Sequence, residues 1–267
     1  MYKRQPYRPS WPSDSDPDEP NTPDDLNTVD HFSYVVGYPE DYRTGEPTDN
    51  KDLWPVKPQG DITRAEVATI FYRLLKADVR DENTTDVSNF SDVNSSDWYG
   101  TTVATLADMG IVKGYEDGTF RPNAPITRAE FAAIATRFFD ETGATYEPGT
   151  FTDVTGSEWF AGAIMDAVNL GLIGGYEDGT VRPNNNITRA ETFAMINRVL
   201  DRQTESVSDL LPTSDMNMWS DNMDADAWYY KDVQEATNYH KCDRVGDSVY
   251  EKWTEKVPDI DWASYQI

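Results

Sequence analysis

The sequence predicts an all-α fold in which three pseudo-symmetric helix–loop–helix repeats surround a central helical bundle. The main observation is an internal repeat, because residues 90–139 align on residues 151–200 without a gap. A second observation is a third copy of the pentapeptide ITRAE at residues 62–66. Repeats of this length are usually single supersecondary units that bury their apolar faces against one another.

The longer helix of each repeat is predicted to begin at ITRAE. Thr63, Thr127 and Thr188 are each followed three residues later by a glutamate. This is the capping-box pattern, in which the Thr hydroxyl accepts from an amide of the first turn and the Glu carboxylate accepts from the Thr amide. Apolar residues such as Phe131 and Ile134 then recur at helical spacing, and we expect these stripes to form the core.

The front half of each repeat predicts a shorter helix that ends at a glycine. In residues 90–110 we expect Asp97 or a neighbouring residue to cap the start, and Gly110 to take the left-handed conformation just past the end. The following GYEDGT segment predicts a turn in which Gly118 tolerates a positive φ.

The first repeat is split between the two ends of the chain. Residues 30–80 hold its back half, with an insertion over 40–55, and residues 211–240 match the missing front half. We therefore expect residues 219–240 to complete this repeat and to close the repeats into a ring. A free-standing fourth half-repeat is the alternative.

The remaining domain boundaries follow from the same alignment. The two complete repeats occupy 90–140 and 151–201. The Pro- and Asp-rich residues 1–29 predict a linker, and we expect a covalently linked cargo upstream of it. Residues 241–267 match nothing in the repeats and either pack as a strap through Trp253 and Trp262 or stay loose.

Composition excludes several classes of protein. With 48 acidic and 23 basic residues the net charge is −25, so the chain cannot neutralise a run of phosphates and is not expected to bind nucleic acid. No apolar run approaches the roughly 20 residues of a membrane span, and the N-terminus lacks the apolar core of a signal peptide. One cysteine, Cys242, and two histidines, His31 and His240, predict no disulfide, no metal centre and no cofactor.

Taken together, these motifs resemble the S-layer homology (SLH) domain. The pattern F-[ST]-D-V…W…GY-x-DGT-[FV]-RP…ITRAE occurs twice in full, and a third, partial copy is divided between two segments. The resemblance implies a non-catalytic module that anchors exported proteins to the bacterial cell wall or S-layer. It further implies binding of an anionic secondary cell-wall polysaccharide, through its pyruvylated ends, in grooves between neighbouring repeats.

The candidate binding residues surround the start of each ITRAE helix. Arg64, Arg128 and Arg189 fall at the first helical position, where free amides and the helix dipole favour an anion and the guanidinium fork fits a carboxylate. Lys57 stands where the other repeats have Arg121 and Arg182, so the site around Arg64 stays open. The predicted glycan-binding set also includes loop and aromatic residues, namely Gly114, Gly175, Asp117, Asp178, Trp98, Trp159 and Trp228.

Each of these residues also has a purely structural interpretation. The tryptophans are either floors for sugar faces or core residues packed on the longer helix. The arginines are either anion ligands or members of ion pairs with nearby carboxylates. The sequence alone leaves both pairs of alternatives open.

Two other functions compete with anchoring. An enzyme is not expected, because scattered carboxylates guarantee chance pairs and no nucleophile–histidine arrangement is present. A self-assembling or calcium-dependent S-layer structural protein is the stronger alternative, although YEDGT lacks the alternating ligand pattern of a calcium loop. The expected protein is a monomer that binds a polysaccharide.

Overall fold

The computed structural model describes residues 23–139, 142–246 and 248–262, so most of the predicted linker 1–29 lies outside the described residues. The chain divides into two compact units. The first contains Thr63–Ile187 with the described residues up to Leu26, and the second contains Asn27–Ile62 with the described residues from Thr188 onward.

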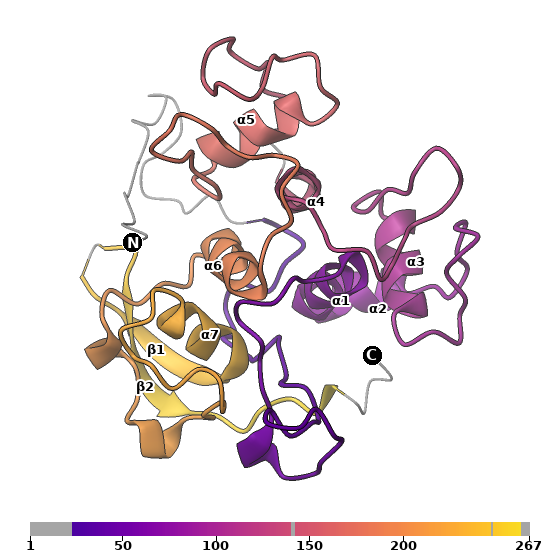
Figure 1. The fold of residues 1–267 in the computed structure, drawn as a ribbon. Helices are drawn as coiled ribbons and strands as arrows, with labels where there is room; N and C mark the ends of the chain where they lie inside the picture. Colours follow the sequence, from indigo (N-terminus) through magenta and orange to yellow (C-terminus); the bar gives the residue numbers. More distant parts are fainter. Residues whose placement is uncertain (1–22, 140–141, 247, 263–267) are drawn as a thin grey trace. The chain divides into compact units, whose positions relative to one another are not determined.

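The described part of the first unit contains five α-helices, drawn in purple to salmon in Figure 1. Helix α1 packs against α3, and α4 packs against α5. The rings of Phe71 and Phe138 stack at a centroid distance of 5.0 Å, and Phe131 lies 5.9 Å from Phe71, so α1 and α4 share one core. The helices are α1 (Arg64–Leu74), α2 (Ala77–Asn83), α3 (Gly100–Asp108), α4 (Arg128–Ala135), which the 3-10 turn η2 (Thr136–Phe138) extends, and α5 (Ala161–Asn169).

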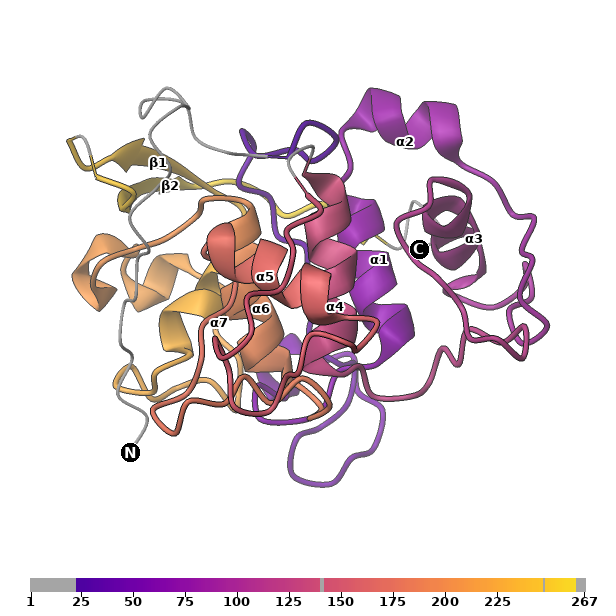
Figure 2. The same ribbon diagram turned by 90° about the horizontal axis from the view of Figure 1, so that it is seen from above.

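The second unit combines two helices with a small sheet. Helix α6 packs against α7, and strands β1 and β2 pair antiparallel, with a bulge between Lys241 and Cys242. Figure 2 shows the two strands side by side. The elements are η1 (Lys51–Leu53), α6 (Arg189–Val199), η3 (Val207–Asp209), η4 (Thr213–Asp215), α7 (Tyr230–Thr237), β1 (His240–Arg244) and β2 (Glu251–Lys256).

The all-α prediction is wrong, because the C-terminal segment forms this two-stranded sheet. On β2 the buried Glu251 and Trp253 alternate with the exposed Lys252, the period of two that a strand requires. Gly246, with a φ of 58°, lies in the connection between the strands. The repeats could not predict these strands, because residues 241–267 have no counterpart in them. Trp253 and Trp262 are both buried, which favours the strap over a loose segment for the described residues 241–246 and 248–262.

The predicted capping boxes are confirmed at the starts of α1, α4 and α6. The carboxylates of Glu66, Glu130 and Glu191 accept from the Thr amides at 2.8–2.9 Å. Gly110 and Gly118 have positive φ, as predicted.

The predicted cap of the shorter helix is wrong. Tyr99 precedes α3 without a side-chain cap, and the Asp97 carboxylate instead accepts from the amide of Asn94.

An aspartate in the front half of each complete repeat holds the loop of the back half. The Asp92 carboxylate accepts from the amides of Phe120 and Arg121 at 2.7 and 2.8 Å. Asp153 does the same for Val181 and Arg182 in the next repeat, at 2.9 and 2.7 Å. We call this arrangement the aspartate clamp.

The same clamp joins the two segments assigned to the split repeat. The Asp221 carboxylate accepts from the amides of Val56 and Lys57 at 2.9 and 2.8 Å. The backbone of Gly37 also lies against the Trp219 ring, where a Cβ atom would not fit. These contacts support a first repeat shared between residues 30–80 and 211–240, which we retain as a proposal. Ring closure stays a prediction.

No helix in the described ranges combines the length and the hydrophobicity that a membrane crossing requires.

We predict that Asp221→Ala lowers the free energy of unfolding by about 1–3 kcal/mol, because the amides of Val56 and Lys57 lose a charged acceptor and Val56 is fully buried. Asp224→Ala is the matched control, since the side chain of the exposed Asp224 accepts from the nearby amide of Asp226 and not from a distant loop among the described residues. Urea unfolding measures both. Equal midpoints for the two variants would contradict a clamp in the split repeat.

Candidate functional site

The three predicted arginines begin α1, α4 and α6, and their side chains are buried. Arg64, Arg128 and Arg189 are 4%, 9% and 4% exposed. Their amides are not free, which corrects the expected anion site. Those of Arg64 and Arg128 donate to the carbonyl oxygens of Ala124 and Asn185, and that of Arg189 to Gly60. The amides of the next helical residues also donate to loop carbonyls.

Arg64 ties α1 to the neighbouring repeat. Its Nε donates to the carbonyl of Phe120 at 2.8 Å, and its Nη2 donates to that of Lys113 at 2.9 Å. Its Nη1 forms an ion pair with Glu130 at 2.8 Å. These contacts favour the structural interpretation for Arg64.

The guanidinium group of Arg128 makes fewer hydrogen bonds than that of Arg64. Its Nη2 donates to the carbonyl of Gly174 at 3.0 Å, and its Nε is buried without a hydrogen-bond partner. The Nε of Arg189, by comparison, donates to Val56 at 2.8 Å. A buried donor without an acceptor costs about 1–3 kcal/mol, so an acceptor from a ligand would be favourable at Arg128.

A tyrosine in the glycine-rich loop of each repeat lies near two cationic side chains. Tyr115 has Arg64 4.9 Å and Arg121 3.9 Å from its ring centroid. Tyr176 has Arg128 at 5.4 Å and Arg182 at 3.8 Å. The equivalent set in the second unit is Tyr38 with Arg189 at 4.8 Å and Lys57 at 4.3 Å.

The cation nearer the tyrosine has a left-handed backbone in all three sets. The φ angles are 51° for Lys57, 58° for Arg121 and 53° for Arg182. A residue with a Cβ atom pays roughly 1–2 kcal/mol for this conformation, which is concentrated at functional sites. The sequence analysis aligned these three residues but left them out of the predicted binding set, although a basic residue directly before proline in every repeat was a visible signal.

The two predicted aspartates, Asp117 and Asp178, accept hydrogen bonds from an arginine of their own loop. Asp117 accepts from the amide and hydroxyl of Thr119, at 3.0 and 2.6 Å, and from Arg121 at 2.9 Å. These hydrogen bonds hold the pKa of Asp117 at about 2. Asp178 has the same partners in its loop, Thr180 and Arg182, and a pKa of about 2. Both carboxylates therefore orient a neighbouring arginine.

The two predicted glycines are needed for packing. A Cβ atom on Gly175 would lie 2.6 Å from the ring of Phe151, and one on Gly114 would overlap Phe90 in the same way. The absence of a Cβ atom lets the aromatic residue of the front half lie directly on the loop.

Two of the three tryptophans are exposed, so the core interpretation is wrong for them. Trp98 is 53% and Trp159 is 67% exposed, whereas Trp228 is half-buried. The rings of Trp98 and Trp159 meet the next aromatic residue edge to face, Tyr99 at 5.2 Å and Phe160 at 5.4 Å. The structure thus joins arginine, tyrosine and aspartate in the Tyr115 and Tyr176 loops, while these tryptophans contact their own neighbours.

The expected absence of a metal centre stays a prediction, but the fold brings together side chains that could hold a metal ion. His31, His240, Cys242 and Glu251 of the second unit bring four possible ligand atoms within 4.8 Å of one another.

Comparison with known proteins identifies the repeats. The family model of the S-layer homology domain matches residues 89–132 and 150–193. A cellulosome-anchoring protein of Acetivibrio thermocellus is 33% identical over 85% of this chain and 47% of its own length. Cell surface glycoprotein 1 of the same organism is 34% identical over 76% of this chain and 9% of its own length. An amylopullulanase of Thermoanaerobacterium thermosulfurigenes is 36% identical over 64% of this chain and 10% of its own length. The chain therefore spans less than half of these relatives.

We predict that Gly175→Ala lowers the free energy of unfolding by about 1–3 kcal/mol, because the new methyl group displaces the Phe151 ring. The adjacent Gly174→Ala is the matched control, since a Cβ atom there meets nothing within 4 Å. Thermal unfolding compares the two. If Gly174→Ala proves as destabilising as Gly175→Ala, close packing on Phe151 is not what requires the glycine.

Proposed function

Because residues 89–132 and 150–193 are S-layer homology domains, we propose that this chain is a non-catalytic module that binds an anionic cell-wall polysaccharide and holds an attached protein at the bacterial surface. The cell-wall surface is the location that this family and these relatives indicate. The finer part of the proposal is the ligand, a secondary cell-wall polysaccharide recognised at its pyruvylated ends.

The main support for the proposal is the position of two arginines, Arg128 and Arg182, beside the ring of Tyr176. Arg182 is 38% exposed in its side chain and is held by Asp178, while the buried Arg128 has an Nε without an acceptor. A carboxylate offers two acceptor oxygens that match a guanidinium fork. We assign the first contact with the ligand to Arg182, and an inner contact to Arg128.

The Tyr115 loop offers a related but weaker site. Arg121 is half exposed in its side chain and is oriented by Asp117, as Arg182 is by Asp178. The inner arginine of this loop, Arg64, already pairs with Glu130. The proposed role of Arg64 is therefore to position the loop, and the anion contact is left to Arg121.

The exposed tryptophans are proposed to bind the sugar rings. Tyrosine and tryptophan side chains are enriched at interaction surfaces. Trp98 and Trp159 precede equivalent helices, and each presents more than half of its surface to solvent. Such a ring can cover the apolar face of a sugar, which a guanidinium does not do.

Strong binding needs local rather than overall electrostatic attraction. The net charge of −25 repels an anionic polymer at long range. The paired cations of each loop act within a few ångströms, inside the screening length of about 8 Å at physiological salt. Several such loops binding the same polymer-coated wall would strengthen the overall attachment, because each bound loop raises the effective concentration of polymer near the others.

The calcium-dependent or self-assembling alternative has less support. The carboxylates of Asp117 and Asp178 each accept from a threonine and an arginine of their own loop. A calcium ion at these loops would have to displace those bonds.

We predict that Arg182→Ala weakens binding to purified cell walls about tenfold or more, because a charge-assisted hydrogen bond is worth about 1.5–3 kcal/mol. Arg43→Ala is the matched control, since Arg43 is also an exposed arginine paired with a nearby aspartate, Asp41. Sedimentation with native walls, and with walls stripped of secondary polymer, measures the binding. Equal binding to stripped walls would refute the proposed ligand, and release of sugar fragments would refute the non-catalytic part.

We predict that Trp159→Ala weakens the same binding about fivefold or more, the usual effect of truncating a central aromatic contact. Because Trp159 is exposed, the free energy of unfolding of the variant should stay within about 0.5 kcal/mol of that of the parent chain. Val87→Ala, at another exposed apolar residue of the first unit, is the control. An unchanged affinity for native walls would exclude Trp159 from the site.

A further inference from the structure

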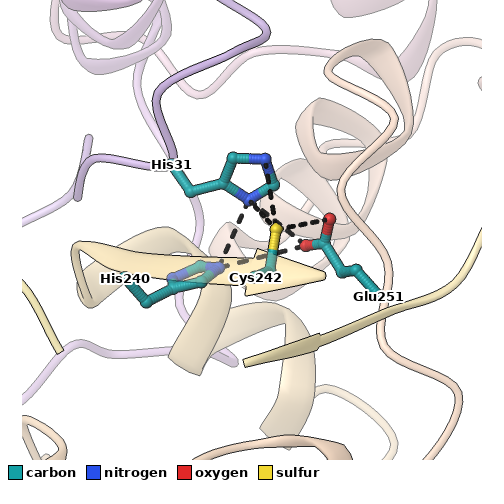
Figure 3. Close-up of side chains that lie close together, drawn as sticks. All are labelled: His31, His240, Cys242 and Glu251. Carbon is teal, nitrogen blue, oxygen red and sulfur yellow. Dashed lines mark hydrogen bonds and ion pairs between the residues drawn. The ribbon is translucent and has the colours of Figure 1, made fainter. Parts of the chain in front are cut away.

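Four side chains with metal-binding atoms converge in the second unit, as Figure 3 shows. His240 and Cys242 lie on β1, and Glu251 is the first residue of β2. His31 comes from a distant part of the sequence and pairs with His240 through a backbone bridge. His31, His240 and Glu251 are more than nine-tenths buried, and Cys242 is half-buried.

Three distances from the Nδ1 of His31 are close to the edges of a tetrahedral site, while the Nε2 of His240 lies 3.9 Å from the Oε1 of Glu251 and all four ligand atoms lie within 4.8 Å of one another. The Nδ1 of His31 lies 3.3 Å from the Nε2 of His240 and 3.3 Å from the Oε1 of Glu251. The Sγ of Cys242 lies 3.7 Å from the Nδ1 of His31. Ligands bound to zinc at about 2.0–2.1 Å for nitrogen and 2.3 Å for sulfur stand about 3.3–3.6 Å apart in a tetrahedron.

Neighbouring groups already orient the ligand atoms. The Nδ1 of His240 lies 2.9 Å from the carbonyl oxygen of Asn238, so Nδ1 donates there and the lone pair of Nε2 faces the cluster. The His240 ring also stacks on Trp253 at 3.7 Å. The indole of Trp253 donates to the Oε2 of Glu235 at 3.1 Å, which leaves Oε1 3.3 Å from the Nε2 of His240.

Two buried carboxylate atoms have no hydrogen-bond partner. These are the Oε1 atoms of Glu235 and Glu251, both of which lie beside the imidazoles. Buried carboxylates need a counter-charge. The buried Arg202 interacts with both glutamates electrostatically, but its Nη groups donate to the backbone carbonyls of Asn27, Asp30 and Phe32. Arg202 thus supplies one positive charge near two carboxyl groups and a thiol, all of which become negative when they lose a proton.

A divalent cation bound among these side chains would satisfy both oxygen atoms and supply the counter-charge that the buried carboxylates need.

We propose that His31, His240, Cys242 and Glu251 form a structural zinc site, with Glu235 beside it. Two imidazoles, a thiolate and a carboxylate make a borderline-soft tetrahedral set, which favours zinc over magnesium or calcium. Four protein ligands in a buried cluster leave no open position for a substrate. The site therefore serves folding rather than catalysis.

The consequence is a cross-link between distant parts of the chain. His31 and His240 are separated by 209 positions, and the metal would fasten the start of the second unit to the β1–β2 hairpin. A two-stranded hairpin alone is marginally stable in water. Because binding to a structural site contributes directly to folding, metal removal should loosen this unit first. The inference stands independently of glycan binding.

Metal content of the full, untagged chain tests the site. After treatment with a strong chelator and dialysis against micromolar Zn²⁺ with millimolar Mg²⁺, we expect one zinc per chain and a higher melting temperature than in the chelated sample. Co²⁺ in place of Zn²⁺ should give a near-ultraviolet thiolate-to-cobalt band. No stoichiometric zinc, together with equal melting temperatures, would overturn the proposal and leave a metal-free histidine–carboxylate network.

Variants show whether the metal lies at these residues. Cys242→Ser and His240→Gln should abolish stoichiometric zinc, and Cys242→Ser should remove the cobalt band. Glu255→Gln is the matched control on β2, since Glu255 is exposed and pairs with Lys241, and it should keep one zinc. Undiminished zinc in Cys242→Ser would overturn the assignment. If that variant does not fold, the cobalt band of the parent chain alone decides, and its absence refutes thiolate ligation.

Discussion

The organisation of each repeat depends on one interaction, the aspartate clamp. Asp92, Asp153 and Asp221 each accept from two consecutive amides of a loop that lies far from them in sequence. The second amide belongs to the basic residue with positive φ. The clamp thus joins the front and back halves of a repeat. It also compensates for the conformation that holds a cation on the face of the loop tyrosine.

Local features of the fold could be predicted from the sequence, and longer-range ones could not. The capping boxes need only residues three positions apart, so Thr63, Thr127 and Thr188 were enough to place them. The sheet lies outside the repeats, where alternation over five or six residues is a weak signal. The cluster around His31 depends on the fold bringing together residues 209 positions apart, which no count of cysteines and histidines reveals.

In the candidate site, too, local features could be predicted from the sequence and longer-range ones could not. The first helical position of Arg64, Arg128 and Arg189 was predictable, but their burial depends on loops of other repeats that cover them. Trp98 and Trp159 had two interpretations because an aromatic residue near a helix start suits either core or surface. The residues best placed to meet a ligand, Arg121 and Arg182, became evident only from their backbone conformation and exposure.

The split repeat has to close a much longer chain than the complete ones. Its clamp joins residues 165 positions apart, from Val56 to Asp221, against 28 from Asp92 to Phe120. Loop-closure entropy grows as (3/2)RT times the logarithm of length, so this closure costs about 1.6 kcal/mol more. The second unit contains further links across the same gap. The Arg202 guanidinium donates to residues 27, 30 and 32, and the Trp262 indole donates to Ser33 at 2.8 Å. These links stabilise the contact between residues 27–33 and the later part of the second unit, and so offset part of the added entropy cost that the proposed split repeat carries.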